Sequence, residues 1–247
     1  MNVCLISAPT ATDFEDVSDA QRVEVRKATL VPQLGVLVLA AALDQCGHPP
    51  AIVNLNQCYY DYLQQGGFGV DRFASWAADA IVATGADVFG FSSISSSYPV
   101  TIRIAECLKC THPECTVLFG GPQASVADLR TLAAFPFIDY VLRGEADESL
   151  PLFLDELASF RNFARVPGLT WRSPLGPCRN QNAPVIRNLD VLPAPAFHLT
   201  GELAHASSAP LELGRGCPFA CTFCSTNDFF RRNFRLRSPE RVLADMR

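Results

Sequence analysis

Residues 87–121 read DVFGFSSISSSYPVTIRIAECLKCTHPECTVLFGG, and the expected fold class follows from them. The first and last parts, 87–92 and 116–119, are apolar runs without alternation, as is typical of strands buried on both faces. The intervening residues 101–110 carry apolar side chains at helical spacing. A strand, a helix and a strand in this order predict a βαβ unit with parallel strands.

The alternation of strand and helix continues on both sides of this unit. Further strands are expected over 3–8, 51–55 and 138–142. Further helices are expected from about residue 33 to the closing Gly47, and near 71–84, 126–134 and 148–159. We therefore predict an α/β fold for residues 1–160: a five-stranded doubly wound parallel sheet of the Rossmann or flavodoxin-like type, with helices on both faces.

Residues 161–205 differ from this sheet domain because prolines and glycines become frequent. Two short β segments, 168–171 and 184–187, predict a hairpin within this linker. A last strand is expected over 211–213. A final helix is expected to start with Ser238 as N-cap and Pro239 in its first turn. Residues 206–247 are thus expected to begin a second domain.

The composition narrows the classes of function. Hydrophobic residues make up 49% of the 247 residues and charged residues 18%, so a sizeable core is available. A net charge of −5 leaves no basic surface for nucleic acid. The longest apolar run, 34–43, is about half of the ~20 residues that a membrane-spanning helix needs, and residues 1–5 lack the features of a signal peptide. We expect a cytoplasmic protein with no nucleic-acid and no membrane partner.

The sequence CPFACTFC, residues 217–224, places three thiols at spacings of four and three residues. Such a loop can bring Cys217, Cys221 and Cys224 onto one 4Fe-4S cluster whose fourth iron has no protein ligand. Structural zinc is a competing interpretation, but zinc usually takes four ligands from two paired knuckles. The candidates for its fourth ligand are Cys178, His198 and His205. Buried core thiols are a third interpretation, against which the flanking Gly, Pro and Arg indicate an exposed loop.

This motif resembles that of the radical S-adenosylmethionine superfamily, in its spacing, in the aromatic Phe223 before the last cysteine and in the preceding Arg215-Gly216. In that superfamily the open iron chelates S-adenosylmethionine, and electron transfer from the cluster cleaves it to a 5′-deoxyadenosyl radical. The resemblance implies Cys217, Cys221 and Cys224 as cluster ligands and Phe223 as a contact of S-adenosylmethionine. It also implies an electron donor protein as a partner and a small-molecule or peptide substrate.

Ligands of open α/β sheets bind beyond the carboxyl ends of the strands, where the strand order reverses. The loops expected there are 9–30, 92–97, 120–123 and 143–145. Their serines donate and accept hydrogen bonds, and their paired glycines let the backbone approach a ligand closely, so this rim suits a bulky polar cofactor. No G-x-G-x-x-G follows the first strand, which argues against a nicotinamide or flavin domain.

Together with the apolar helix over 34–43 and the Gly47-His48 turn, these loops resemble the cobalamin-binding domain that precedes the cluster motif in one large radical S-adenosylmethionine class. The resemblance covers about 1–160 and 184–247. It implies cobalamin as the ligand, with the contacts Ser92, Ser93, Ser95, Ser96, Gly120, Gly121, Gly144 and Glu145; an exposed carboxylate that caps the next helix is the other interpretation of Glu145. Many such domains have an Asp-x-His-x-x-Gly sequence after the first strand, but 9–30 contains no His. Either cobalamin binds here without a protein His on its lower face or the domain has lost it.

In the resembled class, cobalamin accepts a methyl group from S-adenosylmethionine, and a second S-adenosylmethionine generates the substrate radical. Methyl transfer to an unactivated carbon or phosphorus centre is therefore implied, although other members rearrange rings. A complete barrel needs on the order of 200 residues, so 206–247 is expected to be the first βα unit of an incomplete barrel, poorly packed in isolation, and the chain a truncated one that is inactive alone. The alternatives are a non-catalytic cobalamin-binding module with a vestigial cysteine motif, and a zinc-stapled interaction protein.

Overall fold

Seven strands form one mixed sheet in the computed structural model, which describes residues 1–9, 31–67, 69–200 and 208–246. The strand order is β2-β1-β3-β4-β5-β6-β7. The first five strands in this order are parallel to one another, and the last two are antiparallel to their neighbours. The strands are β1 (Val3–Ser7), β2 (Ala51–Asn54), β3 (Val88–Ser92), β4 (Thr116–Gly120), β5 (Tyr140–Leu142), β6 (Leu169–Ser173) and β7 (Gly176–Arg179).

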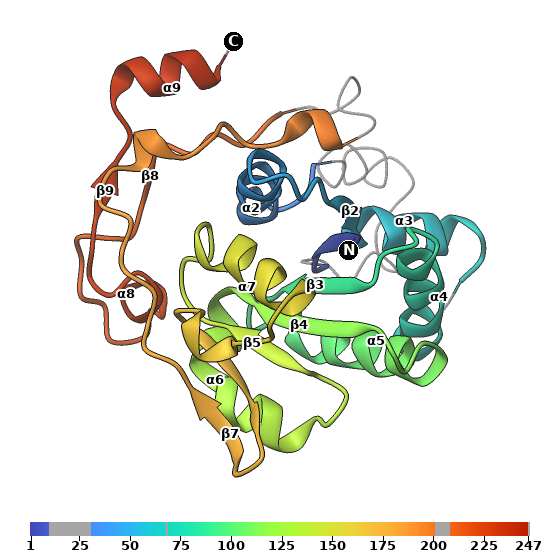
Figure 1. Ribbon diagram of the computed structural model, residues 1–247. Helices are drawn as coiled ribbons and strands as arrows, with labels where there is room; N and C mark the ends of the chain where they lie inside the picture. Colours follow the sequence, from blue (N-terminus) through green and yellow to red (C-terminus); the bar gives the residue numbers. More distant parts are fainter. Residues whose placement is uncertain (10–30, 68, 201–207, 247) are drawn as a thin grey trace.

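Helices cover both faces of the sheet and enclose two separate apolar cores (Figure 1). One core is formed with α3 (Leu55–Gln64), α4 (Val70–Val82), α5 (Tyr98–Thr111) and α6 (Gly121–Ala134). The other is formed with α2 (Leu34–Gln45) and α7 (Ser149–Ala158). The predicted α/β fold with a mostly parallel, doubly covered sheet is confirmed.

The hairpin differs from the prediction in place and in role. Its first strand, β6, is where the sequence placed it, but β7 replaces the expected strand over 184–187, which is not formed. β6 also pairs with β5, with Tyr140 opposite Trp171, so the hairpin extends the expected five-stranded sheet to seven strands. Two physical reasons favour pairing of β6 with 176–179 over pairing with 184–187. The two residues 174–175 make a tight turn, and Pro184 has no N–H to donate to a strand.

Helix α3 was not predicted, because its sequence carries polar side chains and three tyrosines rather than a simple apolar pattern. Asn54 starts it as N-cap, with its side chain accepting a hydrogen bond from the N–H of Asn56. The buried side chains Leu55, Tyr59 and Tyr62 recur at spacings of four and three. This spacing was the available signal for the helix.

The residues 208–246, here called the cysteine segment, run along one side of the sheet domain (Figure 1). A short β8 (Gly214–Arg215) pairs with β9 (Arg235–Leu236), and α8 (Thr226–Phe229) lies between them. The strand expected over 211–213 is thus found at 214–215, directly after the expected residues. Helix α9 (Pro239–Asp245) begins as predicted, with the Ser238 side chain accepting from the N–H of Arg241. Three 3-10 turns complete the described elements: Phe163–Arg165, Leu189–Val191 and Phe197–Leu199.

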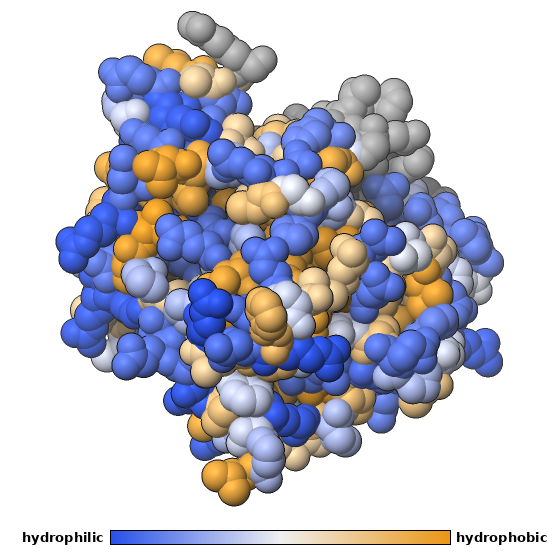
Figure 2. Space-filling model, viewed as in Figure 1, coloured by the Kyte–Doolittle hydropathy of each residue, from blue (hydrophilic) through white to orange (hydrophobic). Residues whose placement is uncertain are grey.

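Among the described residues, no helix is both long enough and apolar enough to cross a membrane. The expected buried helix over 34–43 is confirmed as part of α2, where seven side chains are buried. Figure 2 shows apolar surface among polar surface on the side of the molecule formed by β8, β9 and α8. The large exposed apolar side chains of the cysteine segment are Leu213, Phe219, Phe223, Phe234, Leu236, Leu243 and Met246.

Candidate functional site at the carboxyl ends of the strands

A cavity of about 580 Å³, here called the switch-point cavity, lies at the carboxyl ends of the parallel strands. The chain leaves β1 toward β2 on one side and reaches β3 on the other, so the strand order reverses between β1 and β3. The wall is mostly apolar and includes Leu5, Phe91, Leu118 and Leu142. Its position is the one expected from the sequence, and its lining suits a ligand with a large apolar surface.

The loop expected over 120–123 is not formed, because β4 ends at Gly120 and α6 begins at Gly121; this strand–helix junction meets the serine loop after β3 at the cavity. The N–H of Ser93 donates to the Gly120 carbonyl at 3.1 Å, and the N–H of Gln123 donates to the Ser93 carbonyl at 3.3 Å. Gly121 has a φ of +87°, and a Cβ added to it would lie 2.7 Å from the Ser93 carbonyl oxygen. Only glycine permits this close approach, so Gly121 lets the start of α6 lie against the serine loop.

The predicted serines do not share one environment. Ser92 lines the cavity, as do Gly120, Gly121 and Gly144. Ser93 is buried beneath the loop, where its hydroxyl donates to Gly120. Ser95 donates to Gln123 at 2.7 Å, and Ser96 is exposed. Ser92 is thus the one serine of these four that the structure places on the wall.

The first turn of α2 supplies a part of the wall that sequence reasoning missed. Gln33, Leu34, Gly35, Val38 and Leu39 all line the cavity. A Cβ added to Gly35 would meet nothing within 4 Å, so this helix start faces open space. A glycine inside an otherwise apolar helix pattern was the available signal. The predicted loop over 9–30 lies outside the described residues, except for Pro9.

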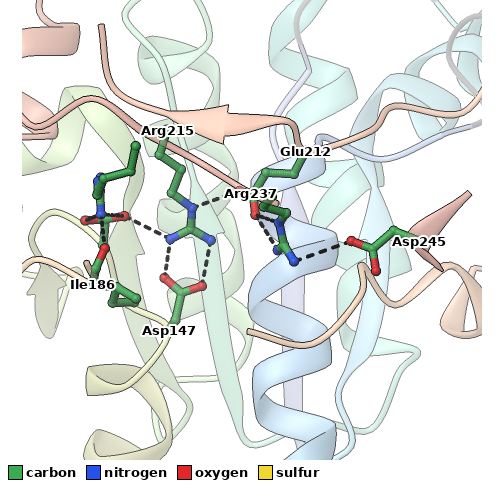
Figure 3. Close-up of polar contacts among 8 residues, drawn as sticks. Asp147, Ile186, Glu212, Arg215, Arg237 and Asp245 are labelled. Atoms are coloured by element: carbon green, nitrogen blue, oxygen red, sulfur yellow. Dashed lines mark hydrogen bonds and ion pairs between the residues drawn. The ribbon is translucent and has the colours of Figure 1, made fainter. Parts of the chain in front are cut away.

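The cysteine segment closes one side of the switch-point cavity. Residues 211–215 line it together with Phe229 and Phe230. Figure 3 shows the Arg215 guanidinium facing the Asp147 carboxylate, which accepts two hydrogen bonds at 2.8 and 2.9 Å. Arg215 also donates to Glu145 at 3.0 Å and to Glu212 at 2.8 Å. Burial alone would lower the pKa of Arg215, but the hydrogen bonds and charges of Asp147 and Glu212 raise it above its usual value.

Two further arginines extend this buried network. Arg235 donates to Glu145 at 2.9 and 3.1 Å and to the Ile186 carbonyl at 2.5 Å. Arg237 donates to Glu212 at 2.6 and 3.1 Å and contacts Asp245 at 3.4 Å (Figure 3). Glu145 was predicted to contact the ligand or to cap a helix. The structure places it on the cavity wall with its carboxylate bound to Arg215 and Arg235, so it links the sheet domain to the cysteine segment.

The three motif cysteines lie on the loop between β8 and α8. Cys217 and Cys224 are half-buried, Cys221 is exposed, and Phe223 points its ring into solvent. Hydrogen bonds from the side chain and backbone of Thr226 lower the pKa of Cys224, which favours the thiolate that binds metals. Three thiols are the donor set that fits an iron–sulfur cluster. In the described parts of the chain, no three His, Cys, Asp or Glu side chains are gathered for a metal ion, so the cluster remains a prediction from spacing.

The other cysteines and the zinc candidates lie elsewhere. Burial raises the pKa of Cys4 and of Cys58 to about 12, which keeps both thiols protonated. Cys178 belongs to β7, opposite Trp171, and His198 contacts Asp44 at 3.2 Å. His205 lies outside the described residues.

Comparison with known proteins connects these features. The B12 binding domain family matches residues 25–154. A hopanoid C-3 methylase from Methylococcus capsulatus is 29% identical over 219 residues, which cover 87% of this chain and 39% of that protein. An uncharacterized methyltransferase, PH0819, from Pyrococcus horikoshii is 27% identical and is matched along 100% of this chain and 50% of its own length. The chain thus spans half or less of the length of these relatives.

Among solved structures, the fold is similar to that of the radical S-adenosylmethionine methyltransferase TsrM from Kitasatospora setae, described with cobalamin and a [4Fe-4S] cluster bound. The TM-score is 0.63 at 14% identity, with 100% of this chain and 45% of that chain covered. The family match covers more than half of the chain, the cavity lies where the strand order reverses, and a cysteine segment closes it. The chain therefore belongs to the B12-binding domain family.

Proposed function

We propose that this chain holds cobalamin in the switch-point cavity and a 4Fe-4S cluster on Cys217, Cys221 and Cys224, as part of an enzyme that transfers methyl groups. The observation that carries the proposal is the shared wall of the cavity. The sheet domain supplies most of it, and the cysteine segment supplies residues 211–215. One cofactor would thus lie within reach of the segment that binds the other.

The residues of this chain fit cobalamin in two respects. The cavity wall is apolar, and it opens at Gly35, where no side chain fills the space. The backbone at Gly120 and Gly121 is exposed to the cavity, and glycine allows a large ligand to approach it. Ser92 adds a hydroxyl that can donate to the ligand or accept from it.

The chemistry of the bound groups would be that of their class: the cluster supplies the electron that cleaves S-adenosylmethionine, and cobalamin carries the methyl group. The chain's own task is placement. Arg215 lies two residues before Cys217 and is held by Asp147 and Glu145 of the sheet domain. This buried network fixes where the cysteine loop starts relative to the cavity. The names of the two methyltransferase relatives support methyl transfer as the reaction.

The test is metal analysis after anaerobic reconstitution with iron, sulfide and hydroxocobalamin. We expect about four irons and one cobalt per chain. Cys217→Ala, Cys221→Ala and Cys224→Ala combined should remove iron and leave cobalt. The matched control replaces Cys46, Cys110 and Cys178 by Ala and should keep both metals. Zinc in place of iron, or iron retained by the motif variant, would overturn the cluster assignment.

The cobalamin half is tested separately by filling the cavity. Gly35→Trp places a large side chain where an added Cβ has open space, so cobalt should be lost and iron kept. Ser75→Trp, on the exposed side of α4, is the control and should keep both. Cobalt bound without iron by the unchanged chain would favour the alternative, a cobalamin-binding module without catalysis.

A further inference from the structure

A second cavity, of about 240 Å³, adjoins the switch-point cavity and shares Pro122, Gly144 and Phe229 with it. We call it the arginine cavity, because three arginines from different parts of the chain line it. Arg143 follows β5, Arg179 ends β7, and Arg231 follows α8. The cavity thus forms only where the sheet domain and the cysteine segment meet.

The charges around this cavity are not balanced. Asp128, fully buried behind the wall, accepts from Arg179 at 2.7 Å and lies 3.3 Å from Arg143. Asp228 is the one acidic residue on the lining itself, so three positive charges face two negative ones. Burial lowers the pKa of Arg143, the negative charge of Asp128 raises it, and the positive charges of Arg179 and Arg231 lower it, so that it lies below its usual value. An anion in the cavity would relieve this repulsion.

Several lining groups keep hydrogen-bond donors for a ligand. Arg231 uses Nη1 to donate to the Ala183 carbonyl at 2.6 Å, and its Nε and Nη2 have no acceptor among the described residues. Within the same described residues, Arg179 binds Asp128 through Nε and Nη2 and leaves Nη1 without an acceptor. The side-chain amide of Asn182 and the hydroxyl of Ser225 complete the donors on the lining. Arg143 already donates from each of its three nitrogens, to Thr170, Asn182 and Asn180, so its main contribution to the cavity is its charge.

We propose that the arginine cavity binds a phosphate group, held by Arg179, Arg231, Asn182 and Ser225. Guanidinium groups bind phosphate oxygens through charge-assisted hydrogen bonds. Two kinds of molecule could carry this phosphate group. It belongs either to the nucleotide tail of a cobalamin bound in the adjoining cavity or to a separate phosphate-bearing ligand.

The first experiment titrates inorganic phosphate into the full chain without cofactors, by calorimetry. We expect saturable binding that Arg231→Gln weakens about tenfold, as the loss of one charged hydrogen bond does. The matched control is Arg232→Gln: it is adjacent, shares the left-handed backbone conformation, is exposed and does not line the cavity. It should bind phosphate like the unchanged chain.

Ser225→Ala is a second variant that leaves all arginines in place, so it should weaken binding severalfold even if Arg231→Gln perturbs the fold. No saturable phosphate binding by the unchanged chain would overturn the proposal. Equal affinities for the Arg231→Gln, Ser225→Ala and Arg232→Gln proteins would do so as well.

The second experiment identifies the source by repeating the titration with saturating hydroxocobalamin or with cobinamide, which lacks the nucleotide tail. If the tail fills the site, hydroxocobalamin blocks phosphate, cobinamide does not, and Arg231→Gln weakens hydroxocobalamin alone. If phosphate binds in both cases, the ligand is a separate molecule. The first titration needs no cobalamin, so failure of the cofactor assignment leaves its outcome interpretable.

Discussion

In the sheet domain most large apolar side chains are buried, whereas in the cysteine segment many are exposed and several charged side chains are buried. Phe91 and Phe119 are 1% and 0% exposed, and their rings stack at 5.3 Å. Phe219 and Phe223 are 70% and 89% exposed, while Arg215 is 8% exposed and bound by three carboxylates. The first region is thus stabilised by apolar burial and the second by buried ion pairs.

This difference has a consequence for how each region responds to change. Apolar packing is spread over many contacts, so the sheet domain should unfold cooperatively. Burying an ion pair costs desolvation free energy, and the attraction between the charges offsets this cost only when the geometry is correct. The cysteine segment should therefore dock in one specific position, but the net free energy of docking should be small. Such a contact suits a segment whose position relative to the cavity matters more than its own stability.

The largest expected effect lies in the sheet domain. Phe119→Ala removes a fully buried ring from the core between the sheet and its helices and should lower the free energy of unfolding by about 3–5 kcal/mol. Urea denaturation followed by far-ultraviolet circular dichroism measures it. Phe160→Ala, which removes an exposed ring, is the control and should change it by less than about 0.5 kcal/mol. Similar losses for the two variants would contradict the buried core.

The matching change in the cysteine segment is Arg215→Met, which leaves Glu145, Asp147 and Glu212 without their shared partner. Loss of one member of a buried pair costs about 3–5 kcal/mol, but here it should act on the docking of the segment and not on the sheet. Hydrogen exchange should therefore quicken in β8, β9 and α8 and stay unchanged in β3 and β4. Arg232→Met is the control without effect, and faster exchange in the whole chain would contradict the distinction between the regions.

A third variant, Asp128→Asn, concerns an ion pair within the sheet domain. The Asp128 carboxylate accepts from Thr170 at 2.5 Å and from Arg179 at 2.7 Å. Burial tends to raise the pKa of Asp128, but the hydrogen bonds from Arg179 and Thr170 lower it below its ordinary value. Its stabilisation is then present above the unfolded pKa of about 3.9 and is lost as the pH falls through the folded value.

Asp128→Asn should therefore cost about 2–3 kcal/mol at pH 7 and progressively less below pH ~4. Urea denaturation at a series of pH values checks this. Asp79→Asn, an exposed carboxylate on α4, is the control. A cost that stays constant down to pH 3 would show that the charge of Asp128 is not what stabilises the fold.

The smallest expected effect is at the start of α9. Ser238→Ala removes the hydroxyl that accepts from the Arg241 N–H at 3.1 Å and should cost about 1 kcal/mol. Hydrogen exchange of α9 amides measures it, because this helix can fray without unfolding the rest. Ser238→Thr keeps the hydroxyl and should restore protection, which distinguishes the cap from a general effect of substitution.

Most of the fold was readable from local pattern. Strands buried on both faces are continuous apolar runs, and 88–91 and 117–119 could be recognised without knowledge of their neighbours. The capping of α9 by Ser238 depends only on residues within 238–241, which are close together in the chain. The three thiols at 217–224 likewise carry their chemistry in their spacing.

The pairing of distant segments could not be read in this way. The hairpin joins the main sheet because β6 pairs with the edge of β5, and these two strands are some thirty residues apart in the sequence. From the sequence, Glu145 was expected either to contact the ligand or to be an exposed carboxylate that caps a helix. Its partners Arg215 and Arg235 lie far from it in the sequence. A charged side chain is buried only where a partner meets it, and no local pattern records that partner.

Local residue order thus determined which segments become strands and helices and which side chains can bind a metal, because both depend on near neighbours. Tertiary structure alone decided that the first turn of α2 and residues 211–215 share one cavity, and that three arginines gather beside it. The physical reason is that sheet edges, cavities and buried ion pairs are properties of contacts between segments that the chain itself keeps far apart.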